Sequence, residues 1–175
     1  MKYQNGFFSF VFSLLLLLPV VSFAEIKVGF VKASELLEKA PQADDARGKL
    51  EREFAPREKR LVAAQQEIAK KEERLAKDRA VLSEPEMKKQ EREIRDQKRD
   101  IGHQQDEFRE DFNIRRNEEL GILQKRIYEV IVALAKQENF DVIVGETAAI
   151  YASEKVDVTA KILQRLQQDY KSGGK

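Results

Sequence analysis

The sequence predicts an α+β chain in which a small β body, built for association, carries a long α-helical coiled-coil hairpin arm inserted between its strands. Short apolar runs of alternating polarity lie near both ends, at 25–31 and 140–153. The stretch between them is dense in charge and has helical spacing. Within it, apolar residues recur every seventh position, as they do along a coiled-coil seam.

Residues 1–24 are interpreted as a secretory signal peptide. Lys2 precedes an apolar run over 7–21, and the small residues Ser22 and Ala24 precede Glu25. A run this short, ending in a cleavage motif, is unlike a membrane span. We therefore expect cleavage after Ala24 and export of the mature chain.

Charge and composition argue against several functional classes. The chain has 32 basic and 31 acidic residues, and Lys2 is the only charge in the first 24, so the mature chain is formally neutral. A dedicated nucleic-acid binder would carry a net basic face, so no nucleic-acid partner is expected. The absence of cysteine rules out disulfides despite the expected export.

No catalytic motif is present in the sequence. There is no phosphate-binding G-x-x-x-x-G-K-[ST] segment. His103 is the only histidine, and it has no second histidine or cysteine with which to share a metal. The carboxylates lie among bases on helical surfaces, and none lies in a predicted apolar pocket that would shift its pKa. We expect no enzyme activity, no metal and no cofactor.

The terminal patches, 25–43 and 138–175, are expected to form the β body. One strand is predicted at 25–31 and two more at 142–144 and 149–152, joined by a turn at 145–147. Asp157 is the expected N-cap of a last helix from 158 to about 170.

Three short strands are a poor core for so long an arm, so self-association through the body is expected. It would also protect the edges of an open sheet. The residues expected at this contact are Ile26, Val28, Phe30, Val142, Val144 and Ile150.

The arm is expected at 44–137, with its turn near 83–85. Ser34 is expected to cap a short first helix, which Pro41 interrupts before Asp44 restarts it. Pro56, inside a helical pattern, predicts a kink or break just before it. Ser83 and Glu86 have capping-box spacing at the start of the second long helix.

Folding the chain back at 83–84 places the two sets of seven-residue repeats opposite each other. The residue numbers of every expected pair add up to the same value, as an antiparallel hairpin requires. The expected apolar pairs are Leu61–Phe108, Ile68–Ile101, Leu75–Ile94 and Leu82–Met87. The layers between would be polar, with Glu58–Asp111, Gln65–Gln104, Glu72–Gln97 and Arg79–Gln90. The alternative choice for the second core position of each heptad would place Lys71 opposite Lys98, which like-charge repulsion disfavours. Polar layers fix register at a cost in stability, so the hairpin should be weak.

Beyond the seam, the second helix becomes richer in apolar residues that must be buried against the strands or other subunits: Leu120, Leu123, Ile127, Val130, Ile131 and Leu134. The aromatic residues Phe54, Phe108 and Phe112 are interpreted as packing at the arm base, with a strip that binds other chains as the alternative.

Four segments resemble the Skp/OmpH family of periplasmic chaperones, in the same order over essentially the whole mature chain: RRNEELGILQKRI at 115–127, FDVIV at 140–144, AIYAS at 149–153 and DVTAKIL at 157–163. The resemblance implies a homotrimer whose strands form a central body and whose three arms enclose a cavity. It also implies a periplasmic holdase that captures unfolded outer-membrane proteins without ATP.

Two basic groups are candidate binding sites. The resemblance implies a lipopolysaccharide or anion patch at Arg115, with which we group Arg116 and Arg126, although Gln104 stands where the family patch has a lysine. The arm tip carries a second basic group, Lys88, Lys89, Arg92, Arg95, Lys98 and Arg99. Their charge would steer the arm tip toward acidic clients or an anionic membrane surface. The alternative for both groups is a solvated helix face paired with nearby acids.

Two other functions compete with the holdase. A structural coiled-coil scaffold of the envelope would share the arm, bind one defined partner and leave aggregation unaffected. An envelope-associated lipid or nucleic-acid binder would depend on the basic pairs at 88–89 and 98–99, against the neutral overall charge.

Overall fold

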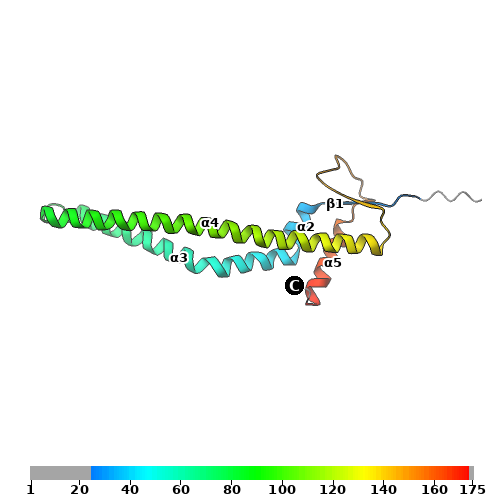
Figure 1. Cartoon of the computed structure of the whole chain (residues 1–175), viewed down its shortest axis with the longest axis horizontal. Helices are drawn as coiled ribbons and strands as arrows, with labels where there is room; N and C mark the ends of the chain where they lie inside the picture. Colours follow the sequence, from blue (N-terminus) through cyan, green and yellow to red (C-terminus); the bar gives the residue numbers. More distant parts are fainter. Residues whose placement is uncertain (1–24, 174–175) are drawn as a thin grey trace, which may run out of the picture.

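The structure, a computed structural model, describes residues 25–173, so the expected signal peptide lies outside the described residues. The elements, in chain order, are β1 (Val28–Val31), α2 (Ala33–Lys39), α3 (Pro41–Asp78), α4 (Glu84–Gln137), β2 (Val142–Gly145) and α5 (Thr159–Lys171). Helices α3 and α4 form a long hairpin that projects from a small body at the other end (Figure 1). This confirms the predicted α+β fold with an inserted helical arm. Across residues 25–173, no helix has the length and apolar content needed to cross a membrane.

The strands of the body pair in parallel, and the whole arm is their connection. Val28 lies opposite Val142, and Val31 lies opposite Gly145. On its other side, β1 meets a short segment before α5. There, the Phe30 N–H donates to the Val156 carbonyl at 2.7 Å, and the Val158 N–H donates to the Phe30 carbonyl at 2.9 Å. Strand β1 is therefore flanked on both sides.

The predicted strand at 149–152 is wrong, because the sheet of the described chain has two strands. The place beside β1 that a third strand would take is occupied by residues 156–158. Residues 149–152 belong instead to the loop that rises above the strands in Figure 1. In this loop, Ile150 and Tyr151 are exposed.

The core of the body is built mainly by helices. Leu36 of α2 and Ile162 and Leu166 of α5 are completely buried. They pack with one stripe of α4, which contributes Leu123, Ile127, Val130 and Leu134. The prediction that this end of the second long helix is buried is therefore confirmed, although Leu120 is exposed. Helix α4 thus runs from the arm tip into the body without interruption.

The first short helix is capped by a distant residue. Helix α2 begins at Ala33, so Ser34 lies inside it and the predicted Ser34 cap is wrong. The Glu146 carboxylate, just after β2, accepts the Ser34 N–H at 2.7 Å and the Ser34 hydroxyl at 2.9 Å. A carboxylate at this end of a helix also complements the helix dipole. The start of α2 is thereby tied to the end of β2.

Helix α3 starts at Pro41, three residues earlier than predicted, and continues unbroken through Pro56. The predicted break is wrong, while the path of the helix does bend in this part of the arm (Figure 1). A proline inside a helix costs about 3 kcal/mol. Phe54 and Leu61, on either side of it, are buried, and each such side chain gains about 1.5–3 kcal/mol on burial. Packing against α4 offsets the proline.

The hairpin turn spans residues 79–83, a few residues earlier than predicted, whereas the second long helix starts where its capping box was predicted. Helix α3 ends at Asp78 and α4 begins at Glu84, with Ser83 as N-cap. The Glu86 carboxylate accepts hydrogen bonds from both the hydroxyl and the backbone N–H of Ser83. The Ser83 side chain in turn accepts the backbone N–H of Glu86, which completes the capping box. These bonds hold the pKa of Glu86 below its usual range.

The apolar seam is confirmed at three of its four predicted pairs. One cluster contains Leu61, Ile68, Ile94 and Ile101 as buried residues, with Leu75 and Phe108 packed against it. Leu82 and Met87, near the turn, are half-buried and lie outside this cluster.

The predicted polar layers are wrong, because Glu58, Gln65 and Glu72 are all exposed. The second seam position shifts by one residue to Ala64, which packs on the apolar cluster. A small apolar side chain fills that place without the cost of burying an amide.

The polar residues pair diagonally at the rim of the seam. The Lys71 ammonium donates to the Gln97 side chain at 3.0 Å, and Lys98 forms an ion pair with Glu72. This arrangement gives each lysine a partner on the facing helix and relieves the repulsion expected between Lys71 and Lys98.

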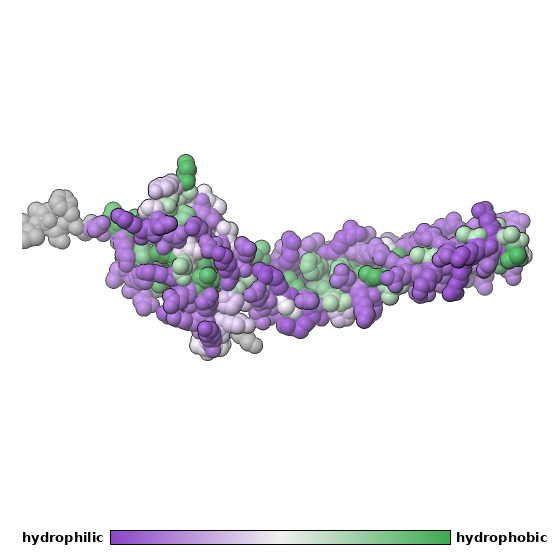
Figure 2. All heavy atoms as spheres, turned by 180° about the vertical axis from the view of Figure 1, so that it is seen from behind, coloured by the Kyte–Doolittle hydropathy of each residue, from purple (hydrophilic) through white to green (hydrophobic). Residues whose placement is uncertain are grey.

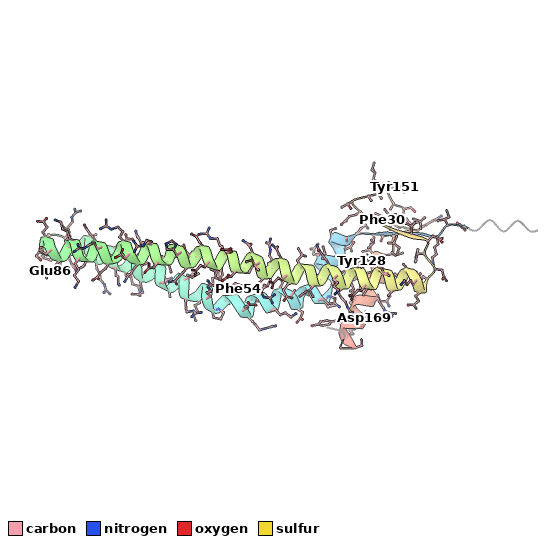
Figure 3. All side chains as sticks on the ribbon, in the orientation of Figure 1. Phe30, Phe54, Glu86, Tyr128, Tyr151 and Asp169 are labelled. Carbon is pink, nitrogen blue, oxygen red and sulfur yellow. The ribbon has the colours of Figure 1, made fainter. Side chains whose placement is uncertain are left out.

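The three aromatic residues form a cluster between α3 and α4. Phe54 meets Phe108 and Phe112 edge-on, with ring centroids 5.6 Å and 5.2 Å apart. Figure 3 places Phe54 between the two helices in the middle of the arm, farther from the body than the predicted base. Aromatic pairs of this kind add about 0.5–1.5 kcal/mol each beyond area burial. The packing interpretation of these residues is supported.

Candidate functional site

The candidate functional surface is the outside of the arm, which is hydrophilic with scattered apolar side chains (Figure 2). Much of its charge is paired along single helices, as with Lys77 and Glu73 at 2.6 Å and Lys70 and Glu67 at 3.0 Å. The hydrogen bond from Lys70 holds the pKa of Glu67 below its usual range. Exposed pairs of this kind contribute little to stability. The arm therefore presents both signs of charge to its surroundings.

The basic group at the arm tip is exposed at all six predicted positions. Figure 3 shows Glu86, at the start of α4, at the end of the arm farthest from the body. Three of the six bases have partners: Lys88 with Glu84, Lys98 with Glu72 and Arg99 with Asp96. The remaining three make no ion pair within residues 25–173: Lys89, Arg92 and Arg95. The tip therefore keeps exposed positive charge, and its steering role stays a prediction.

The predicted anion patch is spread along α4. The Arg115 guanidinium contacts three carboxylates, those of Glu118 at 2.7 Å, Glu53 at 3.2 Å and Glu119 at 2.8 Å. Hydrogen bonds to these carboxylates raise the pKa of Arg115 above its ordinary value.

Arg116 is exposed, and Arg126 lies eleven residues beyond Arg115, or about 17 Å along the helix. Arg126 contacts Glu129 at 3.6 Å and Asp169 at 3.5 Å. Arg115 and Arg126 thus have separate sets of acidic partners, and anion binding by the three arginines stays a prediction.

Sequence reasoning missed a buried charge where the arm joins the body. Glu119 is only 6% exposed, and it is the one buried charged side chain among residues 25–173. It accepts hydrogen bonds from Arg115 of its own helix at 2.8 Å and from Lys49 of α3 at 3.5 Å. Its sequence position carries a signal, because Glu119 precedes Leu123 and Ile127 at intervals of four and so lies on the buried stripe of α4.

A cavity of about 240 Å³ adjoins this carboxylate. It lies between α3, α4 and α5, and its lining includes Asp45, Lys49, Glu119, Leu123 and Tyr170. Two buried polar atoms of lining residues, Gln42 Oε1 and Arg126 Nε, have no hydrogen-bond partner. Packing and polar pairing are therefore incomplete on this side of the junction.

The residues predicted to mediate association are unevenly buried. Four are exposed, namely Ile26, Val28, Val142 and Ile150, whereas Phe30 and Val144 are half-buried. Exposed apolar side chains on and beside a sheet edge are the kind of surface that another chain covers. Association through this surface stays a prediction.

Comparison with known proteins relates the chain to one family. A family model described as outer membrane protein (OmpH-like) matches residues 27–166. The chaperone protein Skp of Pectobacterium atrosepticum is 25% identical over 141 residues, which cover 81% of this chain and 86% of that protein. The crystal structure of a Caulobacter crescentus CB15 protein described as an OmpH-like outer membrane chaperone matches with a TM-score of 0.73. That match covers 83% of this chain and 86% of the other at 10% identity, so it shows a shared fold.

Proposed function

This chain belongs to the OmpH-like family of outer membrane proteins, and we propose that it is an ATP-independent periplasmic holdase chaperone for unfolded outer-membrane β-barrel proteins. The observation that carries the proposal is the arm. Helix α4, with 54 residues, is about 80 Å long at about 1.5 Å per residue, and most of it projects from the body with α3 beside it (Figure 1).

The proposed mechanism is enclosure without tight binding. An unfolded barrel protein exposes apolar strands that pair with other chains and aggregate. Walls made of long helices would keep the unfolded barrel protein away from other unfolded chains. The mixed charges of the arm would supply many weak, salt-sensitive contacts to it. The seam has few buried residues toward its tip, where Leu82 and Met87 are only half-buried, so the arms can splay. Clients of different size are then accommodated.

The proposed assembly is a homotrimer held by the bodies. Ile26, Val28 and Val142 expose apolar surface on and beside the sheet, and Ile150 does so on the loop above it. Contact between bodies would bury these side chains and leave each arm free to form one wall of a cavity. No step requires a catalytic residue or a nucleotide. Release follows because a client that folds stably in the membrane is withdrawn from the binding equilibrium.

A suppression assay tests this function. An outer-membrane barrel protein, unfolded in urea, is diluted into buffer with the mature chain and no nucleotide, and light scattering is followed. We expect scattering to fall as the chain is added, and serum albumin at the same mass serves as the control. Equal scattering with both proteins would contradict the holdase and favour a scaffold with one defined partner.

Anionic ligands are a second, narrower part of the proposal. Arg115, Arg116 and Arg126, together with the tip bases, are the residues proposed to contact lipopolysaccharide or an anionic membrane surface. The exposed, unpaired members of these groups support the proposal at the tip more than at Arg115, whose guanidinium already contacts three carboxylates.

A further inference from the structure

The cavity between α3, α4 and α5 has two buried polar atoms on its wall that no neighbouring group satisfies. They are Gln42 Oε1 and Arg126 Nε, and neither has a hydrogen-bond partner within residues 25–173. The large majority of buried polar side-chain atoms in proteins are paired. Two unpaired atoms on the wall of one cavity therefore mark a place where a ligand can form hydrogen bonds.

Both atoms are held in place by the rest of their side chains. Gln42 Nε2 donates to the Leu166 carbonyl of α5 at 2.9 Å, which orients the amide because only its nitrogen can donate. The terminal nitrogens of Arg126 contact Glu129 at 3.6 Å and Asp169 of α5 at 3.5 Å (Figure 3). The wall thus presents one acceptor on Gln42 and one donor on Arg126, both in fixed orientations.

An amide group complements these two atoms. Its N–H can donate to Gln42 Oε1, and its carbonyl can accept from Arg126 Nε. Each peptide unit of a polypeptide, proline aside, carries one such donor and one such acceptor. The polar part of the cavity is therefore suited to one peptide unit.

The remainder of the wall is apolar and is suited to a large side chain. Ala46, Ile122, Leu123 and Tyr170 contribute to it. Ile122 is 60% exposed, so the cavity is reached from solvent, and the Tyr170 ring offers an edge or a face to a second aromatic ring. The volume of about 240 Å³ lies below the roughly 300–1,000 Å³ of pockets for drug-sized ligands. A single aromatic residue is a ligand of fitting size.

The charges around the cavity favour a neutral ligand. The lining includes three carboxylates and three basic groups, those of Asp45, Glu119, Glu129, Lys49, Lys125 and Arg126. An anion in the cavity would meet repulsion as well as attraction. Although Arg126 belongs to the proposed anion patch, the cavity beside it lacks the excess of positive charge that an anion requires.

We propose that this cavity is a binding site for a neutral aromatic amide, which is the chemistry of one aromatic residue within an unfolded polypeptide. The aromatic side chain lies against Ile122 and Tyr170, and the peptide unit bonds to Gln42 and Arg126. The cavity then gives an unfolded client one discrete anchoring point on the protein, in addition to the weak contacts of the arm. This client step rests on the proposed function, whereas binding of the amide does not.

Fluorescence of N-acetyltryptophanamide tests the site in the full mature chain. The chain has no tryptophan, so emission excited in the indole band comes from the probe alone. We expect a saturable blue shift as wild-type chain is added, with a dissociation constant on the order of 0.1–1 mM for a ligand of this size. Absence of saturable binding, as for a cavity that holds only water, would overturn the proposal.

Ala46→Leu is the variant that fills the cavity, and it should weaken binding at least tenfold. Ala63→Leu makes the same change at an exposed position of the same helix and is the matched control, with binding unchanged. If Ala46→Leu fails to fold by circular dichroism, Arg126→Lys keeps the charge and removes the Nε donor, and it should weaken binding about fivefold. Equal dissociation constants for the wild type and the folded cavity variant would place the probe elsewhere and overturn the proposal.

A matched pair of probes tests the preference for a neutral ligand. N-acetyltryptophan carries a free carboxylate in place of the terminal amide, and we expect it to bind at least fivefold more weakly than N-acetyltryptophanamide. Binding of the carboxylate as tight as that of the amide would instead identify an anion site at Arg126 and overturn the neutral assignment.

The suppression assay addresses the client step separately. We expect about twice as much Ala46→Leu as Ala63→Leu to be needed for the same fall in scattering. Equal amounts, with binding of the probe lost in Ala46→Leu, would overturn the client step alone. A wild type that binds the probe and leaves scattering unchanged would overturn the proposed function and support the amide site.

Discussion

Lys32 and Asp157 form an ion pair, with 2.8 Å between Nζ and Oδ2, that joins the end of β1 to the start of α5. Two further hydrogen bonds lie beside this ion pair. The Thr159 hydroxyl accepts the Lys32 backbone N–H at 3.0 Å, and the Asp157 carboxylate accepts the Thr159 backbone N–H at 2.9 Å. The arm lies between these residues in the sequence. This cluster therefore closes the body across the whole insertion.

Replacing Asp157 should change how body stability depends on pH. Burial acts to raise the pKa of the Asp157 carboxyl, but hydrogen bonds from Lys32 and Thr159 outweigh burial and lower it below its usual value. Because the pKa is lower in the folded state, the ionised Asp157 adds to the free energy of unfolding of the body at pH values above the unfolded pKa of about 3.9. This added stability is lost as the pH falls through the folded pKa. We expect Asp157→Asn to lower the Tm at pH 7, with the difference from wild type closing toward pH 2.5.

Tyrosine fluorescence is the measurement, because the chain has no tryptophan. Within residues 25–173 the tyrosines are Tyr128, Tyr151 and Tyr170, all outside the seam. Glu154→Gln, at an exposed position nearby, is the control and should show no such trend. A Tm difference that stays constant with pH would contradict the role given to Asp157.

Arm and body should unfold separately. Ile94 and Ile101 are 7% and 9% exposed in a cluster that the body does not share. Ile94→Ala or Ile101→Ala should each cost about 2–5 kcal/mol locally, through lost transfer energy and the cavity left behind. We expect hydrogen exchange to accelerate along the arm, most of all near Ser83, while residues 142–145 stay protected. Val62→Ala, at an exposed position of α3, is the control. Equal acceleration in arm and body would show that they unfold as one unit.

Periodic and local signals predicted the arm because both operate over short distances. The repeats that include Ile68 and Ile101 fixed the hairpin, and the spacing of Ser83 and Glu86 located its turn. The apolar pairs could not, however, decide whether Ala64 or Gln65 would fill the second seam position. That choice depends on how the helices rotate against each other, which the seven-residue repeat leaves open.

The errors in the body have a different cause, which is competition between distant segments. Ser34 has the local features of a cap, but Glu146 reaches that helix end from beyond the arm. Residues 149–152 have strand-like alternation, but Val156 and Val158 already bond to β1. Glu119 was missed, because its burial depends on how α3 packs against α4 at the root of the arm. The first two errors concern contacts made across the insertion.

The mature chain should associate as a trimer through the body. Ile150 is exposed on the loop beside the strands, and burying it in a contact should contribute about 1.5–3 kcal/mol. We expect sedimentation equilibrium at low micromolar concentration to give three times the protomer mass, and Ile150→Asp to weaken association. Val81→Asp, at another exposed apolar position, near the arm tip, should leave the mass unchanged. A folded wild-type monomer under these conditions would contradict the assembly.

Reversing charge at the arm tip should slow client capture. Lys88 is paired with Glu84 at 2.6 Å, whereas Lys89 makes no ion pair within residues 25–173, and both are exposed. Screening limits such charges to about 8 Å at physiological salt, so they act on the encounter rate more than on final affinity. We expect Lys88→Glu with Lys89→Glu to reduce the stopped-flow rate of capture of an acidic unfolded barrel protein several-fold at low salt, and to have little effect at high salt.

The matched control reverses two exposed lysines of the body, as Lys155→Glu with Lys171→Glu. Both variants change the net charge of the chain by the same amount, so only the position of the charge differs between them. If overall charge governs capture, the two variants slow equally. If the tip steers clients, only the tip variant has a flattened dependence of rate on salt. Identical salt slopes for wild type and tip variant would leave the tip lysines as an ordinary solvated face of the coiled coil.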